Sequence, residues 1–252
     1  MAAQGVFAVV GGPGVLLSAV QGIACCAKGA CTVELSVSNH SILTIKFANV
    51  SKNIFYQTSL SVDHQDQTTN FIACQVFLKD FINALFCCSG FDQLDLIFDP
   101  DDSSLVKLRC SDQESTFNSE IRTLDLILSH EIPPSVPLGG LTADSEVIST
   151  AFSQCNDSGI DKVHIAFHGS LELRTSVPGG CDTHVVVPQS RMENLSGDNI
   201  TMSIPGKEIG VITSFVSSLG KCNIELATSG LVFRKRLITG NDALLVVCAC
   251  EN

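Results

Sequence analysis

FIACQVFLKDFINALFCCSGFDQLDLIF, residues Phe71–Phe98, contains a pattern that returns about 130 residues downstream. In this stretch a helical stripe is followed by a glycine and then by alternating strand residues, namely Leu78, Phe81, Ile82 and Leu85, then Gly90, then Leu94-Asp95-Leu96. The same order returns in Ile212, Phe215, Val216 and Leu219, then Gly220, then Ile224-Glu225-Leu226. This recurrence of helix, glycine stop and strand indicates an internal duplication.

Earlier segments of the two halves correspond at nearly the same offset. The matched segments are Leu16-Leu17-Ser18 with Val147-Ile148-Ser149, Val33-Glu34-Leu35 with Val163-His164-Ile165, and Ser41-Ile42-Leu43 with Ser170-Leu171-Glu172. Several elements that share one offset are typical of two copies of one structural unit. The sequence therefore predicts two tandem domains, residues 1–123 and 141–252, joined by a linker at residues 124–140.

Composition narrows the function classes. The chain has 252 residues, of which 45% are hydrophobic, so each half can bury a core. A net charge of −11 argues against a free-standing basic nucleic-acid binder, although it leaves room for a local basic patch. No apolar run reaches membrane-spanning length without glycine or polar breaks, so the sequence predicts no membrane partner.

Cysteine usage leaves two interpretations. Twelve cysteines, together with Asn-x-Ser/Thr sequences at Asn39, Asn49, Asn156, Asn194 and Asn199, are compatible with a secreted, disulfide-rich binding module. The amino terminus, however, is a poor signal peptide, because it has no basic residue before Lys28 and its apolar run is broken by glycines. Many cysteines also lie in apolar periodic segments, as small hydrophobic residues would. We expect reduced, intracellular thiols.

The order of the predicted elements sets the fold class. Each half contains a strand, a helix, a run of strands, a second helix and a further run of strands. The helices are expected from Pro13 to about Cys26, in the Phe71–Phe98 stretch, at Ala143–Cys155 and at Lys207–Leu219. Runs of strands with two helices per half exclude a doubly wound parallel sheet. The sequence predicts antiparallel α+β domains with four helices on one side.

The segment Leu124–Gly140 fits neither half. It contains Leu126, Leu128, Ile132 and three prolines, which favour an extended chain outside any central strand. We expect an apolar, extended connector.

Catalytic and metal motifs are weak. The glycine turn Gly11-Gly12-Pro13-Gly14, with Glu34 about twenty residues on, matches part of a dinucleotide-binding motif, but Leu17 occupies the place of the third glycine. The cysteine pairs lack the spacing of zinc knuckles, and no G-x-S-x-G or phosphate-loop sequence occurs. A dinucleotide-dependent enzyme or a thiol enzyme remains an alternative function of another class.

The duplicated plan and the apolar connector resemble the eukaryotic sliding clamps of the proliferating-cell-nuclear-antigen (PCNA) fold. Within that group, three segments are most similar to the Rad-one type of subunit in the heterotrimeric 9-1-1 checkpoint clamp, namely Asn70–Phe81, Leu171–Thr175 with Val185–Pro188, and Val246–Asn252. The resemblance implies two tandem clamp domains, with antiparallel sheets outside and helices lining a ring. It also implies a non-catalytic nuclear protein without a cofactor, whose partners are two other clamp subunits, double-stranded DNA, a clamp loader and client proteins.

The resemblance places functional residues as well. Non-specific phosphate contact is expected from Lys28, Lys79, Lys207 and Lys221. Subunits are expected to join through edge strands near Leu105–Cys110 and Leu171–Arg174. A pocket for short client peptides is expected from Val50, Leu128, Ile132, Pro133, Ala249 and Cys250. Asp80, Asp144, Glu146 and Glu208 offset the few lysines, which favours a heterotrimer over a homotrimeric replicative clamp.

Overall fold

The computed structural model describes residues 5–24, 31–38, 41–64, 71–99, 104–124, 130–156, 159–176, 182–197, 199–217, 220–237 and 242–250. The chain forms two compact units. The first consists of Met1–Val50, Tyr56–Glu131 and Leu237–Ala243, and the second of Ser51–Phe55, Ile132–Arg236 and Leu244–Asn252. Among the described residues, no helix is long and apolar enough to cross a membrane.

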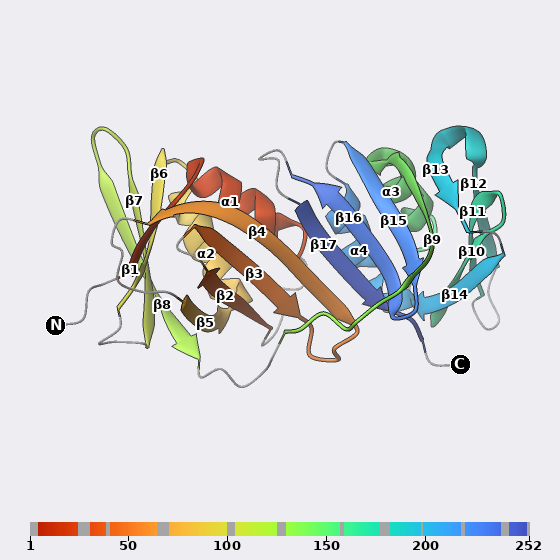
Figure 1. The fold of residues 1–252 in the computed structure, drawn as a ribbon, viewed down its shortest axis with the longest axis horizontal. Coiled ribbons are helices and arrows are strands. Elements are labelled where there is room, and N and C mark those ends of the chain that lie inside the picture. The colour runs from red at the N-terminus through yellow and green to blue at the C-terminus, as the bar shows by residue number, and fades with distance from the viewer. Residues whose placement is uncertain are drawn as a thin grey trace. The chain divides into compact units, whose positions relative to one another are not determined.

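The first unit is an antiparallel α+β domain (Figure 1). Its elements are β1 (Gly5–Val9), α1 (Gly12–Gln21), β2 (Thr32–Ser38), β3 (Ile42–Ala48), β4 (Ile54–His64), β5 (Phe71–Phe77), α2 (Leu78–Cys88), β6 (Gln93–Phe98), β7 (Leu105–Ser111) and β8 (Thr116–Leu124). The strands are hydrogen-bonded in the order β1-β6-β7-β8-β5-β2-β3-β4, and β4 pairs back onto β1. The order of the strands therefore closes on itself.

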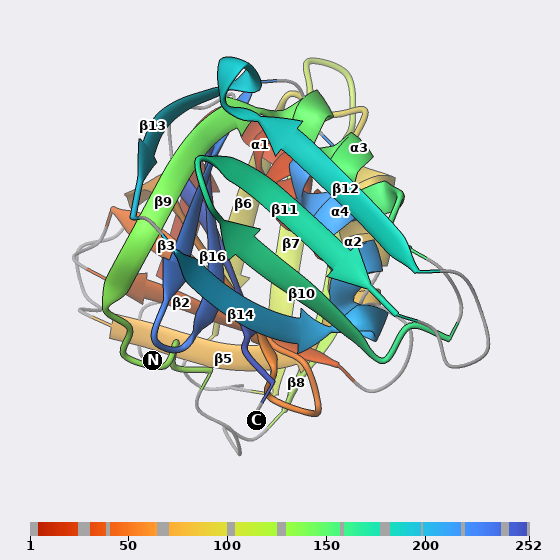
Figure 2. The same ribbon diagram turned by 90° about the vertical axis from the view of Figure 1, so that its right-hand side faces the viewer.

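The second unit repeats this plan in two sheets. Its elements are β9 (Pro137–Asp144), α3 (Ser145–Ser153), β10 (Lys162–Phe167), β11 (Ser170–Thr175), β12 (Thr183–Pro188), η2 (Gln189–Arg191), β13 (Met192–Ser196), β14 (Ile200–Pro205), η3 (Gly206–Glu208), α4 (Ile209–Val216), β15 (Lys221–Ala227), β16 (Gly230–Arg236) and β17 (Asp242–Cys248). One sheet has the order β17-β16-β15-β9-β13 and the other β12-β11-β10-β14, which Figure 2 shows face-on.

Strand pairing confirms the duplication. The ladder β1-β6-β7 of the first unit recurs as β9-β15-β16, and β5-β2-β3 recurs as β14-β10-β11. The registers also correspond, because Ala8 faces Asp95 in the first unit and Gly140 faces Glu225 in the second. Each half is thus one copy of the same supersecondary unit, as predicted.

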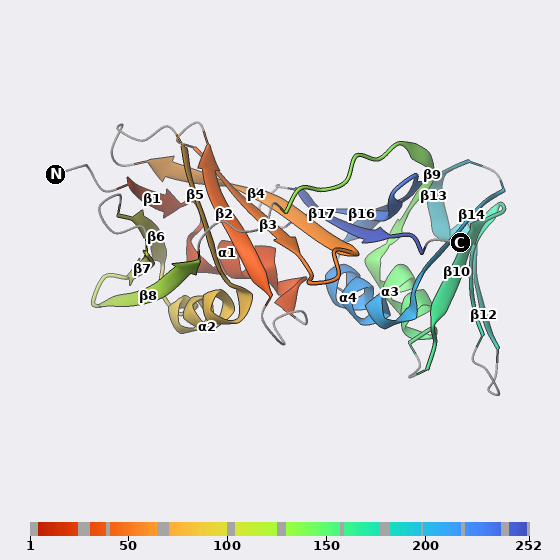
Figure 3. The same cartoon turned by 90° about the horizontal axis from the view of Figure 1, so that it is seen from below.

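The helices cover one face of the sheets within each unit, as Figure 3 shows. In α2 the predicted stripe of Leu78, Phe81, Ile82 and Leu85 is buried. In α4 the corresponding Ile212, Phe215 and Val216 are also buried, whereas Leu219 lies outside the described residues. Burying these apolar stripes stabilises each helix on its sheet, since short isolated helices are marginal in water.

The prediction for the connector was wrong at its carboxyl end. Pro137–Gly140 begins β9, which lies inside a sheet between β15 and β13. Pro137 is the first residue of the strand, a position where a missing N–H is tolerated. At Gly139 an added Cβ would come within 2.5 Å of the Ser196 carbonyl oxygen, so the backbones approach closely there. The duplication itself contained the signal, since a strand precedes the helix in the first half.

The glycine turn does not form a dinucleotide site. β1 pairs antiparallel with both β4 and β6, so the parallel β-α-β unit is absent at this position. Gly11 and Gly12 have φ angles of 85° and 74°, which only glycine adopts readily. At Gly12 an added Cβ would lie 2.4 Å from the Asp92 carbonyl oxygen. The glycines therefore fit a tight start of α1 against the chain that leads into β6.

The described cysteines are free thiols. Cys74, Cys88, Cys110, Cys155 and Cys222 are buried, as expected for small hydrophobic residues. Burial raises the pKa of the Cys74 and Cys222 thiols to about 12, with the Glu34 carboxylate contributing at Cys74. Thiols with such pKa values are poor nucleophiles at neutral pH.

Candidate functional site

The helix side of the two units contains few basic groups. Within the described parts of α1 to α4, Lys79 in the first turn of α2 is the one basic residue, and it is exposed. Lys207 in η3 is also exposed, with its Nζ 3.9 Å from a Glu208 oxygen. Lys28 lies outside the described residues. The predicted DNA-facing lysines are therefore sparse.

Lys221, the fourth predicted lysine, is paired with an acid. At the start of β15 it donates hydrogen bonds to both carboxylate oxygens of Glu193 on β13, at 2.6 and 2.7 Å. The hydrogen bond that Lys221 donates to Glu193 raises the pKa of the Lys221 ammonium. A cavity of about 650 Å³ adjoins it, lined by Asp144, Glu146, Ser149, Thr150, Ser217, Gly220 and Lys221. This part of the second unit is acidic rather than basic.

Glu208 is a buried carboxylate with a specific partner. The residue is 5% exposed, and Asn53 Nδ2 donates a 2.8 Å hydrogen bond to its Oε1. Burial raises the pKa of the Glu208 carboxyl, and the Asn53 hydrogen bond and Lys207 partly oppose that shift. The Asn53 carbonyl oxygen also accepts a bond from the Cys248 N–H at 2.8 Å. Asn53 thus attaches the Ser51–Phe55 segment to the second unit.

The predicted peptide pocket is only partly assembled. Val50, in the first unit, is 80% exposed, and Leu128 lies outside the described residues. Ile132 and Pro133 are half-buried, and neither is among the described residues that line the hollows of about 400, 650 and 730 Å³. Ala249 and Cys250 do share a groove. The connector is fixed to the second unit beyond them, since Val136 and Thr228 exchange two hydrogen bonds of 3.0 Å.

The groove beside the chain end has a volume of about 730 Å³ and lies over β10, β11 and β14. Its residues are Leu138, His164, Ile165, Ala166, His168, Glu172, Arg174, Thr201, Met202, Ser203, Ala227, Thr228, Ala249 and Cys250. Ser203 Oγ and His164 Nδ1 share a 2.7 Å hydrogen bond, and Arg174 donates to Glu172 at 2.7 Å. The Arg174 guanidinium holds the pKa of the Glu172 carboxyl below its usual range. The sequence analysis did not join these outward side chains of the sheet into one site.

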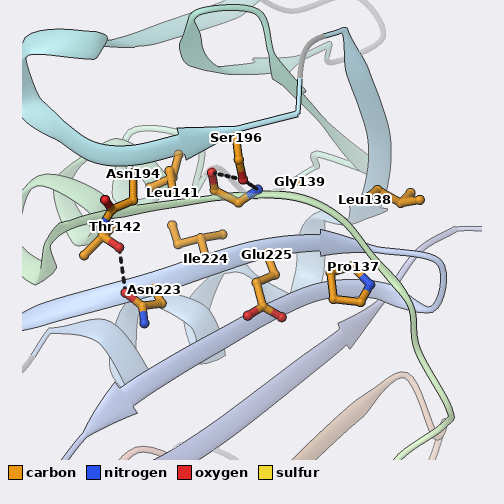
Figure 4. Close-up of a pocket in the computed structure, with 11 residues that line it drawn as sticks. Pro137, Leu138, Gly139, Leu141, Thr142, Asn194, Ser196, Asn223, Ile224 and Glu225 are labelled. Atoms are coloured by element: carbon orange, nitrogen blue, oxygen red, sulfur yellow. Dashed lines mark hydrogen bonds between the residues drawn. The ribbon is translucent and has the colours of Figure 1, made fainter.

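A second hollow, of about 400 Å³, lies where β13 separates from β9 (Figure 4). The register shifts between Glu193 and Ser196, and Asn194 has a φ angle of 54°, so the edge strand bulges there. Ser196 Oγ stays within hydrogen-bond distance of the Gly140 N–H and carbonyl oxygen, at 3.2 and 3.3 Å. A bulge on an edge strand blocks regular pairing with another strand.

The unpaired strand edges differ from those expected. β7 lies between β6 and β8, and β11 lies between β10 and β12, so neither is an edge. Among the described residues, β12 and β14 are the end strands of their sheet, and residues 116–122 of β8 have registered partners only on β7. The resemblance placed these two strands at edges, whereas the strand order pairs each of them on both sides.

No group of His, Cys, Asp or Glu in the described part of the chain is arranged to hold a metal ion. Potential nucleophiles are likewise dispersed. The Ser203–His164 pair lies on an open sheet surface, where His164 is exposed and no acid of the described residues bonds to its ring. The described residues therefore offer surfaces for binding rather than a recognisable catalytic arrangement.

Comparisons with known proteins agree with the strand order. No protein-family model matches the sequence, and no curated protein sequence is significantly similar to it. Among solved structures, the chain is similar to the PCNA2–PCNA3 complex from Sulfolobus tokodaii, with a TM-score of 0.72 at 13% sequence identity. The match covers 97% of this chain and 98% of the other. The protein therefore has the two-domain sliding-clamp fold of PCNA, with antiparallel sheets and two helices in each half.

Proposed function

We propose that the protein is a non-catalytic subunit of a heterotrimeric, ring-shaped DNA clamp of the 9-1-1 type. In this proposal it acts in the nucleus, joins two different clamp subunits, is placed on double-stranded DNA by a clamp loader, and recruits checkpoint and repair proteins. The observation that carries the proposal is a two-domain clamp fold in which, among the described strands, β8 of the first unit and β12 of the second each have residues unpaired on one side. Two such edges allow head-to-tail joining with neighbours on both sides.

The composition of the two edges supports joining. β12 exposes Val186 at 49%, an apolar side chain in the middle of an end strand. On β8 the ring of Phe117 stacks on Phe91, with centroids 6.1 Å apart. The neighbouring helix α2 exposes Phe86 at 59%. Apolar side chains beside unpaired backbone groups are typical of surfaces that another chain covers.

The charge on the helix side supports unlike partners. A duplex in a ring meets phosphates on all sides, and each lysine neutralises at most one of them. The described helices contribute only Lys79, while Asp80 and Glu146 are exposed on the same elements. Three identical copies would line a ring with little positive charge. We propose that the other two subunits supply it, with Lys28, Lys79 and Lys207 as this chain's contribution.

The alternative function is a homotrimeric replicative clamp. The oligomeric state of the isolated chain distinguishes it from the heterotrimeric clamp. We expect the isolated chain to be monomeric in native mass spectrometry at micromolar concentration, and to form a one-to-one-to-one complex with two partner clamp subunits. Val186→Lys should prevent that complex, because a charge on the end strand opposes strand pairing. Val136→Lys changes another exposed valine and should leave the complex intact. A stable homotrimer of the isolated chain would contradict the proposal.

The peptide pocket is also proposed on the resemblance, with Val50, Leu128, Ile132, Pro133, Ala249 and Cys250 as its residues. The groove at Ala249 and Cys250 supports a binding surface at the chain end. Replacing Leu128 and Ile132 by Ser should abolish capture of client peptides while the melting temperature falls by only a few degrees. Retained capture, or an unfolded variant, would remove these two residues from the pocket.

The secreted alternative is tested by titrating thiols in denatured protein without reductant. The proposal expects close to twelve reactive thiols, the number of cysteines in the chain. A titre near zero would favour a disulfide-rich extracellular module.

A further inference from the structure

Lys221, one of the residues predicted to contact phosphate, is instead bonded to Glu193 in an ion pair. Both carboxylate oxygens accept from the same ammonium, at 2.6 and 2.7 Å. The side chains are 54% and 59% exposed, so the pair lies at the surface where a nucleic acid would approach. A lysine held by two oxygens presents little net charge to a third anion.

The strand that carries Glu193 follows a different path in the two units. In the first unit β4 runs without interruption until Val62, Asp63 and His64 pair with β1. In the second unit the corresponding course is broken after Pro188 by the turn η2, and β13 then pairs with β9. β12 and β13 together thus take the route of β4, with β13 as a separate short strand paired to β9.

The matching positions of the first unit contain no such pair. Glu193 faces Thr142 on β9, and the position that corresponds to Thr142 is Val10, whose N–H donates to the Ser61 carbonyl oxygen. Ser61 therefore stands where the second unit has Glu193. Lys221 corresponds to Phe91, which packs on an aromatic ring. The ion pair belongs to the second unit alone.

The surroundings reinforce the pair. Asp144 lies opposite Lys221 in the strand register, and Asp144 and Glu146 line the cavity that Lys221 also lines. A phosphate entering this cavity would meet the carboxylates of Asp144 and Glu146 and one ammonium that is already bonded to Glu193. Like charges at such distances repel a polyanion even if the lysine changes partner.

We propose that β13 is an electrostatic mask, in which Glu193 withdraws Lys221 from phosphate contact and keeps this part of the second unit away from DNA. The inference rests on the proposed function and sharpens it. Phosphate contact by this chain then falls on Lys79 and Lys207, and on residues outside the described ranges such as Lys28. Removing the carboxylate of Glu193 should unmask a contact that the native chain does not make.

The test measures binding of a 20-base-pair duplex by the full chain across a series of salt concentrations. Glu193→Gln should raise the affinity at low salt about fivefold and steepen the slope of log K against log[salt] by about 0.9, the value for one added phosphate contact. Adding Lys221→Gln to this variant should restore the native slope. The matched control is Glu120→Gln, which removes a carboxylate 3.6 Å from Lys107 on the exposed β7–β8 pair and makes the same change in net charge.

Equal affinity and slope for Glu193→Gln and Glu120→Gln would overturn the mask, since both would then report only the change in net charge. An absence of DNA binding by Glu193→Gln at low salt would overturn it too. Neither result bears on ring assembly, which native mass spectrometry with the partner subunits measures separately. Failure of the mask and failure of the clamp function are therefore distinguishable.

Discussion

The central strands of the two units pair in the same way but carry different polar side chains at matching positions. Across the sheet of the first unit, Gln75, Glu34 and Lys46 lie side by side in the register, with Gln75 buried and the other two half-buried. At the corresponding positions the second unit has Ser203, His164 and Arg174, which border a groove. Alternating residues of the same strands, such as Val33 and Val163, are fully buried in both units. The apolar residues that face the core maintain the same fold in both units. The polar residues between them on the same strands differ between the units.

The two units also differ at the starts of their first helices. We expect the largest effect on the free energy of unfolding from a substitution there. α1 begins at Gly12, which has a positive φ angle and no room for a Cβ, whereas α3 begins after Asp144, which is exposed and extended. Gly12→Ala should lower the free energy of unfolding by about 3 kcal/mol, from backbone strain and a clash with a carbonyl oxygen.

The matched change in the second unit is Asp144→Ala, which should cost only about 0.5 kcal/mol because Asp144 makes no side-chain capping bond. Urea unfolding of the two variants measures both values. Equal losses would show that the glycine start is not a constraint of the first unit.

The second prediction concerns Glu208, the buried carboxylate at the N-cap of α4. In the first unit the N-cap of α2 is Phe77, which has no charge. The pKa of Glu208 is raised by burial, so the native state binds its proton more tightly than the unfolded chain. Stability from this group therefore increases as pH falls through the native pKa, is complete below the ordinary carboxyl pKa, and is absent at higher pH.

Glu208→Gln keeps an acceptor for Asn53 and removes the buried charge. At neutral pH it should leave the protein equally stable or stabilise it by about 1 kcal/mol, and the increase in stability toward pH 5 should disappear. Urea unfolding at several pH values provides the measurement. A strong loss of stability at pH 7 would mean that the charge itself fixes Asn53.

The smallest effects are expected from the surface ion pairs of equivalent strands. In the first unit Arg109 donates to Asp95 at 2.7 and 3.0 Å, and in the second Arg234 donates to Glu225 at 3.2 Å. Replacing either arginine by Ala should cost about 1 kcal/mol or less, with the larger loss for Arg109, whose partner is the more buried. Thermal unfolding in low and high salt checks the order, and the losses should shrink with salt.

The sequence was sufficient for the duplication and the fold class because apolar periodicity depends on neighbours within each element. β9 was missed since a proline and two glycines hid its first half. β13 was missed because Met192–Ser196 is mostly polar and half-exposed. The pair formed by Glu193 and Lys221 joins residues far apart in sequence, so no local pattern could reveal that a predicted DNA contact was already occupied.

Encirclement of DNA is the central claim, and retention on circular DNA tests it most directly. The chain, its two partner subunits and the clamp loader would be incubated with nicked circular DNA and passed through a sizing column in high salt, which removes contacts made only through phosphates. The clamp should stay with the circle and be released when one restriction cut makes the DNA linear. Loss from the intact circle, or equal retention on circular and linear DNA, would contradict a ring that encloses the duplex.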